Sequence, residues 1–232
     1  MARIEKADRN TLPEEFKERF DIIEQSNGYI PNSYLLLAHR PPILKALMDL
    51  SKAVIRDEGT LDRGFRFLIA YISSRTAGCQ FCQAHNISSA SRWGISDEKL
   101  NAIWDYETSP LFTDAERAAF DYARGASVVP NAVTDEIFAR MKKYYSTPQI
   151  VEMTAVIALF GWQNRFNDTL HTDLDRHTLD WAAQFWTIAC AADGLKFDMM
   201  DTSFFVGRET LVPSIRARMW RSAVCCRRSK VS

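Results

Sequence analysis

Apolar residues recur along most of the chain at the three- and four-residue spacing of an amphipathic α-helix. This pattern, with capping residues at its boundaries, predicts helices over residues 11–28, 33–39, 41–59, 62–77, 78–94, 96–104, 113–126, 134–141, 149–170 and 178–194. Strand-type alternation persists nowhere, so the predicted fold class is all-α, a helical bundle. The Thr113-Asp114-Ala115-Glu116 run has the sequence of a capping box.

The predicted helix over residues 149–170 has an unusual pattern. It is apolar on nearly every side up to Phe160 and then turns polar. A helix that is apolar all round is usually buried, so we expect this one to lie at the centre of the core. In its polar part, Arg165 and Asp168 are three residues apart, which fits either an ion pair on one helix or two residues that line a site.

Length and charge indicate an ordinary globular protein, long enough for one domain with a large core or for two small domains. The chain has 232 residues and a formal net charge of zero, so its overall charge does not indicate a nucleic-acid or membrane partner. No apolar run reaches the ~18–20 residues of a membrane span. We expect a flexible N-terminus over residues 1–12, a single helical domain over 13–194, and a C-terminal extension with a basic tail over 195–232.

Cysteine usage favours a reducing compartment. The five cysteines are an odd number in a chain of this length, which does not fit a secreted disulfide framework. The first thirty residues carry charges throughout, unlike a signal peptide. The expected location is therefore cytoplasmic. In that setting a Cys-x-x-Cys pair is more often catalytic or metal-binding than structural.

The candidate chemistry lies in residues 78–85. Cys79 and Cys82 are about one helical turn apart, and His85 follows one turn later. Gly78 permits a sharp entry into the helix, whose first turn has unpaired N–H groups that favour a thiolate and lower the pKa of a thiol. The pattern predicts redox or peroxide chemistry by a dithiol with a neighbouring imidazole.

The run Ser74-Arg75-Thr76-Ala77-Gly78-Cys79-Gln80-Phe81-Cys82-Gln83-Ala84-His85 resembles the redox-active helix of the AhpD-like alkylhydroperoxidase and carboxymuconolactone decarboxylase family. Residues 108–119, 129–134 and 161–170 resemble the longer, peroxidase-related branch of that family. The likeness covers roughly residues 15–180. It implies an AhpD-like helical bundle that forms homo-oligomers.

The resemblance also implies roles for three residues. Cys82 becomes the thiol that attacks peroxide, Cys79 the resolving thiol, and His85 part of the proton relay. The implied enzyme is a peroxidase that reduces small organic peroxides or hydrogen peroxide, uses an external dithiol as reductant, and needs neither metal nor bound cofactor. Two positions depart from the family pattern: Phe67 stands where the family has a glutamate, and Phe81 where some members have a histidine. Asp168 or His171 are candidates to substitute in the relay.

Other interpretations of the same residues stay open. The cysteines alone fit two buried small side chains or part of a zinc site, although a structural zinc site needs four ligands. A lactone decarboxylase would bind a carboxylate with Arg165, His85 or His171. A third alternative is a non-enzymatic redox sensor whose oligomeric state changes when the disulfide forms.

Overall fold

The computed structural model describes residues 1–179, and every regular element in that range is a helix. The all-α prediction is therefore confirmed for the described residues. The α-helices are α1 (Glu14–Asn27), α2 (Asn32–Leu37), α3 (Pro41–Ser51), α4 (Arg63–Thr76), α5 (Gln80–Arg92), α6 (Asp97–Asn101), α7 (Asp114–Ser127), α8 (Asp135–Tyr144) and α9 (Thr147–Thr169), with short 3-10 or π turns at Arg9–Thr11, Lys52–Arg56, Ile103–Asp105 and Arg176–Thr178. The predicted helix over 178–194, the extension over 195–232, Cys190, Cys225 and Cys226 lie outside the described residues.

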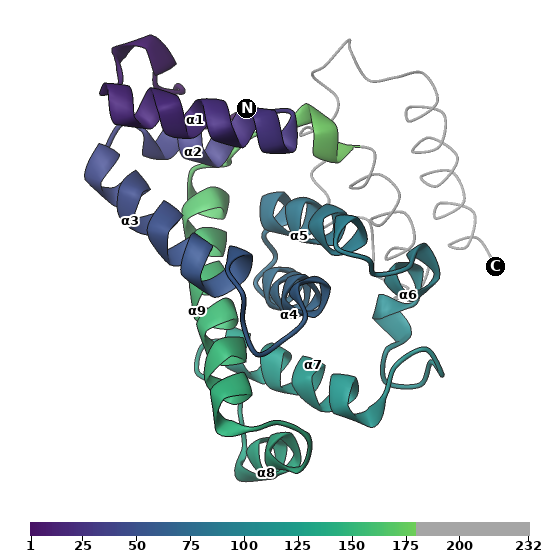
Figure 1. Cartoon of the computed structure of the whole chain (residues 1–232). Helices are drawn as coiled ribbons and strands as arrows, with labels where there is room; N and C mark the ends of the chain where they lie inside the picture. The colour runs from purple at the N-terminus through teal and green to yellow at the C-terminus, as the bar shows by residue number, and fades with distance from the viewer. Residues whose placement is uncertain (180–232) are drawn as a thin grey trace, which may run out of the picture. The chain divides into compact units, whose positions relative to one another are not determined.

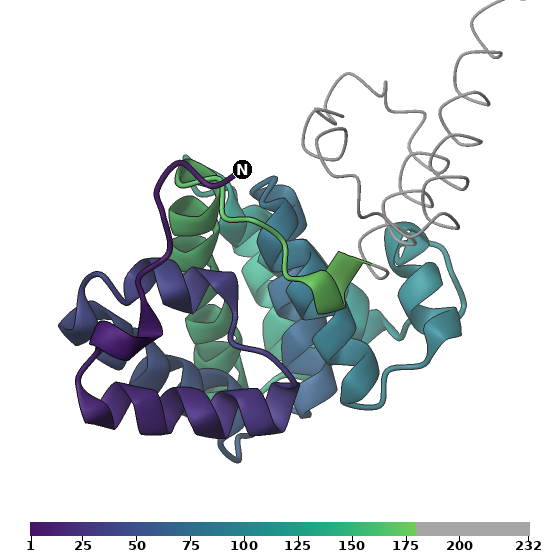
Figure 2. The same cartoon turned by 90° about the horizontal axis from the view of Figure 1, so that it is seen from above.

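Helix α4 lies at the centre of the bundle. It packs against α5, α7 and α9, and Figure 1 shows it nearly end-on among them. Helices α1 to α3 gather on one side, as Figures 1 and 2 both show. The expectation that the 149–170 helix is central is wrong: one face of α9 is exposed, with Val151 at 61% and Trp162 at 42%. The sequence pattern shows that α9 is apolar on nearly every side, but it does not show which of these sides other helices cover.

Helices α4 and α5 form a tight antiparallel pair. Gly78 joins them with a φ of +77°, a left-handed conformation that favours glycine. At the other end of the pair, Gly64 on α4 faces the main-chain carbonyl of Trp93, which caps α5. A Cβ on Gly64 would lie 2.7 Å from that oxygen, so no side chain fits there without a shift of the backbone. The two glycines fix the α4–α5 pair at both ends.

Helix α1 does not begin with the capping residue that the sequence predicted. Thr11 does not cap α1; the N-cap is Pro13, and the Thr11 hydroxyl donates to the carbonyl of Asp8 within a short 3-10 turn. The segment before it makes main-chain hydrogen bonds to distant parts of the fold, from Arg3 to Leu170 and from Ala7 to Leu35. The flexibility expected for residues 1–12 stays a prediction. The capping box at Thr113 and Glu116 is confirmed.

A buried ion pair ties α4 to α9. Arg66 Nε lies 3.3 Å from Glu152 Oε1, and the side chains are 3% and 14% exposed. The Arg66 guanidinium also donates to the carbonyls of Val54 and Asp57, both at 3.1 Å. Glu152 in turn accepts from the N–H of Thr60 at 2.7 Å. The pair therefore holds the 54–60 segment against the two helices.

None of the helices within residues 1–179 combines the length and the apolar character that crossing a membrane requires.

Candidate functional site

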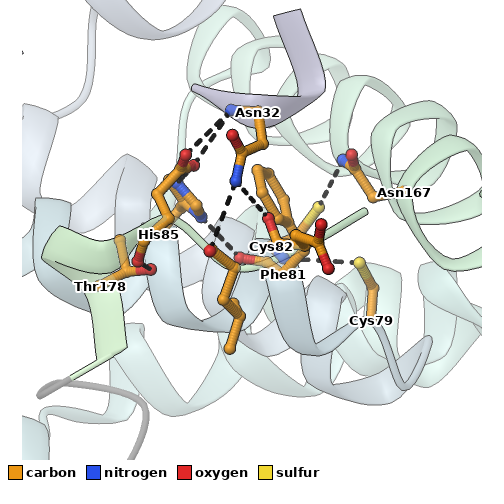
Figure 3. A network of polar contacts seen from close by, with 10 residues as sticks. Asn32, Cys79, Phe81, Cys82, His85, Asn167 and Thr178 are labelled. Carbon is orange, nitrogen blue, oxygen red and sulfur yellow. Dashed lines mark hydrogen bonds and ion pairs between the residues drawn. The ribbon is translucent and has the colours of Figure 1, made fainter. Parts of the chain in front are cut away.

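Cys79 and Cys82 lie together at the entrance of α5. Cys79 is the N-cap residue, and its sulfur accepts a hydrogen bond from the N–H of Cys82 at 3.4 Å (Figure 3). Both thiols are free and buried, at 1% and 2% exposure. The predicted helix entrance and the proximity of the two thiols are thus present in the fold.

An asparagine on α9 completes the surroundings of Cys82. Asn167 Nδ2 donates to Cys82 Sγ at 3.4 Å, across the interface between α5 and α9 (Figure 3). The sequence showed a polar end to this helix but gave no reason to select Asn167. Its spacing from Cys82 is set by the packing of two helices, which the local pattern does not encode.

The electrostatics of Cys82 oppose the expected activation. Burial raises the pKa of the Cys82 thiol well above its ordinary value, and the neighbouring Cys79 and the charge of Asp168 raise it further. The hydrogen bond from Asn167 lowers this pKa, but desolvation is the larger effect. The prediction that the helix entrance lowers the pKa is therefore wrong for Cys82 in this conformation.

We accordingly expect the alkylation of Cys82 by iodoacetamide to accelerate about tenfold per pH unit from pH 7 to 9, without a plateau, because only the thiolate reacts. Mapping of labelled peptides by mass spectrometry separates Cys82 from the other cysteines. An Asn167→Leu variant should react more slowly at each pH, since it loses the contact that lowers the pKa. A plateau below pH 8 would contradict the raised pKa.

His85 is directed away from the thiols. Its Nδ1 lies 2.8 Å from the carbonyl oxygen of Phe81, and its Nε2 lies 2.8 Å from Asp175 Oδ2 (Figure 3). Both ring nitrogens are therefore engaged with oxygen atoms in this arrangement. Within residues 1–179 no hydrogen bond joins His85 to either cysteine. The proton-relay role of His85 stays a prediction, and it requires a different orientation of the ring.

Asp175 is the partner of His85 that the sequence analysis missed. Its carboxylate is 6% exposed and also accepts the main-chain N–H of Asn32, at 3.0 Å. Helix α2 has Pro31 as its N-cap and no side-chain cap of its own, which explains why an acid from the segment after α9 serves its first N–H. The main-chain carbonyl of Asp175 accepts the Thr178 hydroxyl at 2.8 Å.

Aromatic rings enclose the His85–Asp175 pair. Phe81, at the position where some relatives have a histidine, stacks on His85 with ring centroids 4.1 Å apart. Tyr29 stacks on His177 at 4.9 Å and lies tilted to His85 at 6.2 Å. Burial, followed by the charge of Asp175, raises the pKa of Tyr29 to about 12, so its hydroxyl stays protonated at neutral pH.

The other predicted candidates lie in different surroundings. The Arg165 guanidinium donates to the main-chain carbonyl of Gly161 at 2.8 Å instead of pairing with Asp168, and both side chains line one pocket of about 250 Å³. His171 is exposed at the end of α9, in a left-handed conformation with a φ of 49°. Phe67 is half-buried on α4, which leaves the family's glutamate position without a polar group.

No group of three or more His, Cys, Asp or Glu side chains is arranged to hold a metal ion in the portion of the chain the structure describes. In that part of the chain, the site consists of the Cys79 and Cys82 thiols and the side-chain amide of Asn167.

An all-α bundle with a Cys-x-x-Cys pair at the start of α5 is the arrangement that the resemblance to AhpD-like proteins implies. Comparison with known proteins agrees. Residues 41–125 match the model of the carboxymuconolactone decarboxylase family, and the chain belongs to that family.

Three relatives illustrate the match. Over 116 residues the chain is 36% identical to the uncharacterized protein YnjA of Escherichia coli K12, covering 50% of this chain and 63% of that protein. It is 30% identical to the debrominase Bmp8, covering 76% of this chain and 96% of that one with a TM-score of 0.67. An uncharacterized peroxidase-related protein with an AhpD core, from Ralstonia eutropha JMP134, shares the fold at 21% identity, covering 76% and 94% with a TM-score of 0.70.

Proposed function

We propose that the protein is a thiol-dependent peroxidase that reduces small organic peroxides or hydrogen peroxide with Cys79 and Cys82. The observation that carries the proposal is the contact between the two residues at the entrance of α5, where the Cys79 sulfur lies 3.4 Å from the Cys82 nitrogen. Residues so close together can form a disulfide with little movement of the backbone. Family membership and the peroxidase-related fold neighbour support the same class of activity.

The proposed reaction consumes two thiols for each peroxide. The Cys82 thiolate attacks one oxygen of ROOH, the O–O bond breaks, and the leaving alkoxide takes a proton to become ROH. Cys82 is then a sulfenic acid. The Cys79 thiol attacks its sulfur, water leaves, and the disulfide forms. An external dithiol then reduces this disulfide and is itself oxidised to a disulfide.

The burial of the thiols sets a requirement on this reaction. With Cys79 and Cys82 at 1% and 2% exposure, peroxide reaches the sulfur only when the surrounding side chains move. The same movement would rehydrate Cys82 and bring its pKa back toward the ordinary value, because desolvation is the main cause of the shift. Access and activation are therefore coupled in the proposed enzyme.

The test is a thiol count combined with disulfide mapping. After treatment of the reduced protein with a small excess of tert-butyl hydroperoxide, we expect two thiols per subunit to disappear and a Cys79–Cys82 disulfide to appear in the peptide map. Addition of a dithiol should restore both thiols. Full retention of all thiols after peroxide treatment would exclude the proposed function.

Reductive dehalogenation is a second candidate, favoured by the 30% identity to the debrominase Bmp8. A cysteine-to-alanine variant of that protein has a structure in complex with 2,3,4-tribromopyrrole. On this chain the same dithiol would supply the two electrons: a carbon–bromine bond and two thiols would become a carbon–hydrogen bond, HBr and a disulfide. Thiol loss with the bromopyrrole but not with peroxide would favour this candidate.

Decarboxylation receives less support from the geometry. Both ring nitrogens of His85 already face oxygen acceptors, so they are not free to bind a carboxylate substrate. The redox-sensor alternative, the external dithiol and the homo-oligomer stay predictions. The exposed apolar residues Val151 and Trp162 on α9 are compatible with contacts between subunits.

A further inference from the structure

A pocket of about 250 Å³ lies between α4, α7 and α9. Ser73, Ser127 and Asn164 line it together with Gly161, Arg165 and Asp168. Arg165 and Asp168 are exposed, whereas Asn164 is 2% exposed. The pocket therefore has charged groups at its exposed part and a carboxamide in its buried part.

Asn164 has no hydrogen-bond partner for either atom of its carboxamide. Both Nδ2 and Oδ1 are buried and unpaired in the described structure. A buried polar group without a partner costs about 1–3 kcal/mol, so such a side chain needs an explanation. A leucine of nearly the same size would fill the position without this cost. The unpaired donor and acceptor point to a ligand that supplies both partners.

The pocket is linked to the dithiol through residues of α9. Asn167, which donates to Cys82 Sγ, follows Asn164 by one turn of α9. The charge of Asp168, another lining residue, is close enough to raise the pKa of Cys82. The polar end of α9 therefore contributes both to the lining of the pocket and to the surroundings of the sulfur that is proposed to react.

We infer that this pocket binds small, neutral hydroperoxides and that Asn164 anchors their O–O–H group. The inference rests on the proposed peroxidase function and adds the residue that binds its substrate. A hydroperoxide carries an acceptor oxygen and a donor O–H one bond apart, which matches the Nδ2–H donor and Oδ1 acceptor of one carboxamide. Arg165 and Asp168 offset each other in charge, which favours a neutral ligand.

Two variants test the pocket in a stopped-flow measurement of thiol oxidation in the reduced protein. Asn164→Leu should slow oxidation by tert-butyl hydroperoxide about tenfold or more, because it removes both hydrogen bonds. Gly161→Leu fills the pocket. It should slow thiol oxidation by tert-butyl hydroperoxide more than oxidation by hydrogen peroxide, which is the smaller molecule. Ala158→Leu adds similar bulk at an exposed α9 position outside the pocket and serves as the matched control; it should keep wild-type rates.

Thermal stability distinguishes a binding residue from a structural one. If Asn164 serves the ligand, Asn164→Leu should raise the melting temperature by about 2–4 °C while it slows the reaction, since an unpaired carboxamide leaves the core. If Asn164 serves the fold, the same variant should lower the melting temperature. A lower melting temperature together with wild-type rates in both variants would overturn the inference.

A binding measurement separates the pocket from the chemistry. In the Cys79→Ser, Cys82→Ser double variant, tert-butyl hydroperoxide cannot be consumed by the dithiol. We expect it to shift the NMR signals of the Asn164 side-chain amide, and this shift to be absent in Gly161→Leu. A shift without thiol oxidation in the wild type would refute the peroxidase function and keep the pocket. Thiol oxidation without any shift, at rates that neither pocket variant changes, would mean that the pocket holds only water.

Discussion

Replacing Cys82 with serine should abolish peroxide turnover, with a loss of at least about 10³-fold, because the attacking sulfur is gone and a serine hydroxyl is not ionised at neutral pH. Cys79→Ser should behave differently. That variant keeps the attacking thiol, so it should consume one equivalent of peroxide and stop at a sulfenic acid on Cys82. Steady-state turnover and trapping of the sulfenic acid with dimedone measure the two outcomes.

The control for these variants uses the remaining cysteines. A triple variant with Cys190, Cys225 and Cys226 changed to serine should retain turnover, since the proposed chemistry needs only the α5 pair. If Cys82→Ser turned over peroxide at the wild-type rate, the assignment of the attacking thiol would be wrong. If the triple variant lost turnover, the resolving step would involve a cysteine outside the Cys-x-x-Cys motif.

The largest expected effect on stability comes from the Arg66–Glu152 pair. Glu152→Leu should lower the free energy of unfolding by about 3–5 kcal/mol, because it leaves the Arg66 guanidinium buried without its counter-charge. The variant also removes the acceptor for the N–H of Thr60. Chemical denaturation monitored by circular dichroism measures the change.

An exposed pair of the same residue types is the matched control. Arg124 Nη1 lies 2.6 Å from Glu107 Oε1, but these side chains are 53% and 62% exposed. Glu107→Leu should therefore cost less than about 1 kcal/mol, since solvent screens the charges. The double variant Arg66→Leu, Glu152→Leu should be more stable than Glu152→Leu alone. Equal costs for Glu152→Leu and Glu107→Leu would show that burial does not decide the strength of these pairs.

The sequence predicted the helices well because their signals are local. Apolar spacing, the Thr113 capping box and the glycines at the ends of α1 and α5 each act within a few residues. The position of a helix in the bundle is not local. Helix α9 was expected at the centre from its composition, yet α4 takes that place, and α9 keeps Val151 and Trp162 at the surface. An apolar face does not reveal which partner covers it.

In the site, too, contacts within one helix could be predicted from the sequence, whereas contacts between distant segments could not. The Cys79–Cys82 contact follows from spacing on one helix, and it was predicted. The partners Asn167 and Asp175 lie 85 and 90 residues away from the residues they contact, Cys82 and His85. The raised pKa of Cys82 escaped prediction for a related reason: desolvation depends on everything packed around the thiol, whereas the helix entrance was visible in the sequence.

The close approach of Gly64 to the Trp93 carbonyl limits which parts of the bundle can open. With the far end of the α4–α5 hairpin locked in this way and its near end joined at Gly78, the two helices cannot slide along each other. Under the proposed function, the movement that admits an oxidant to the thiols therefore comes from the elements packed around this hairpin, such as α9, and not from sliding of α4 along α5.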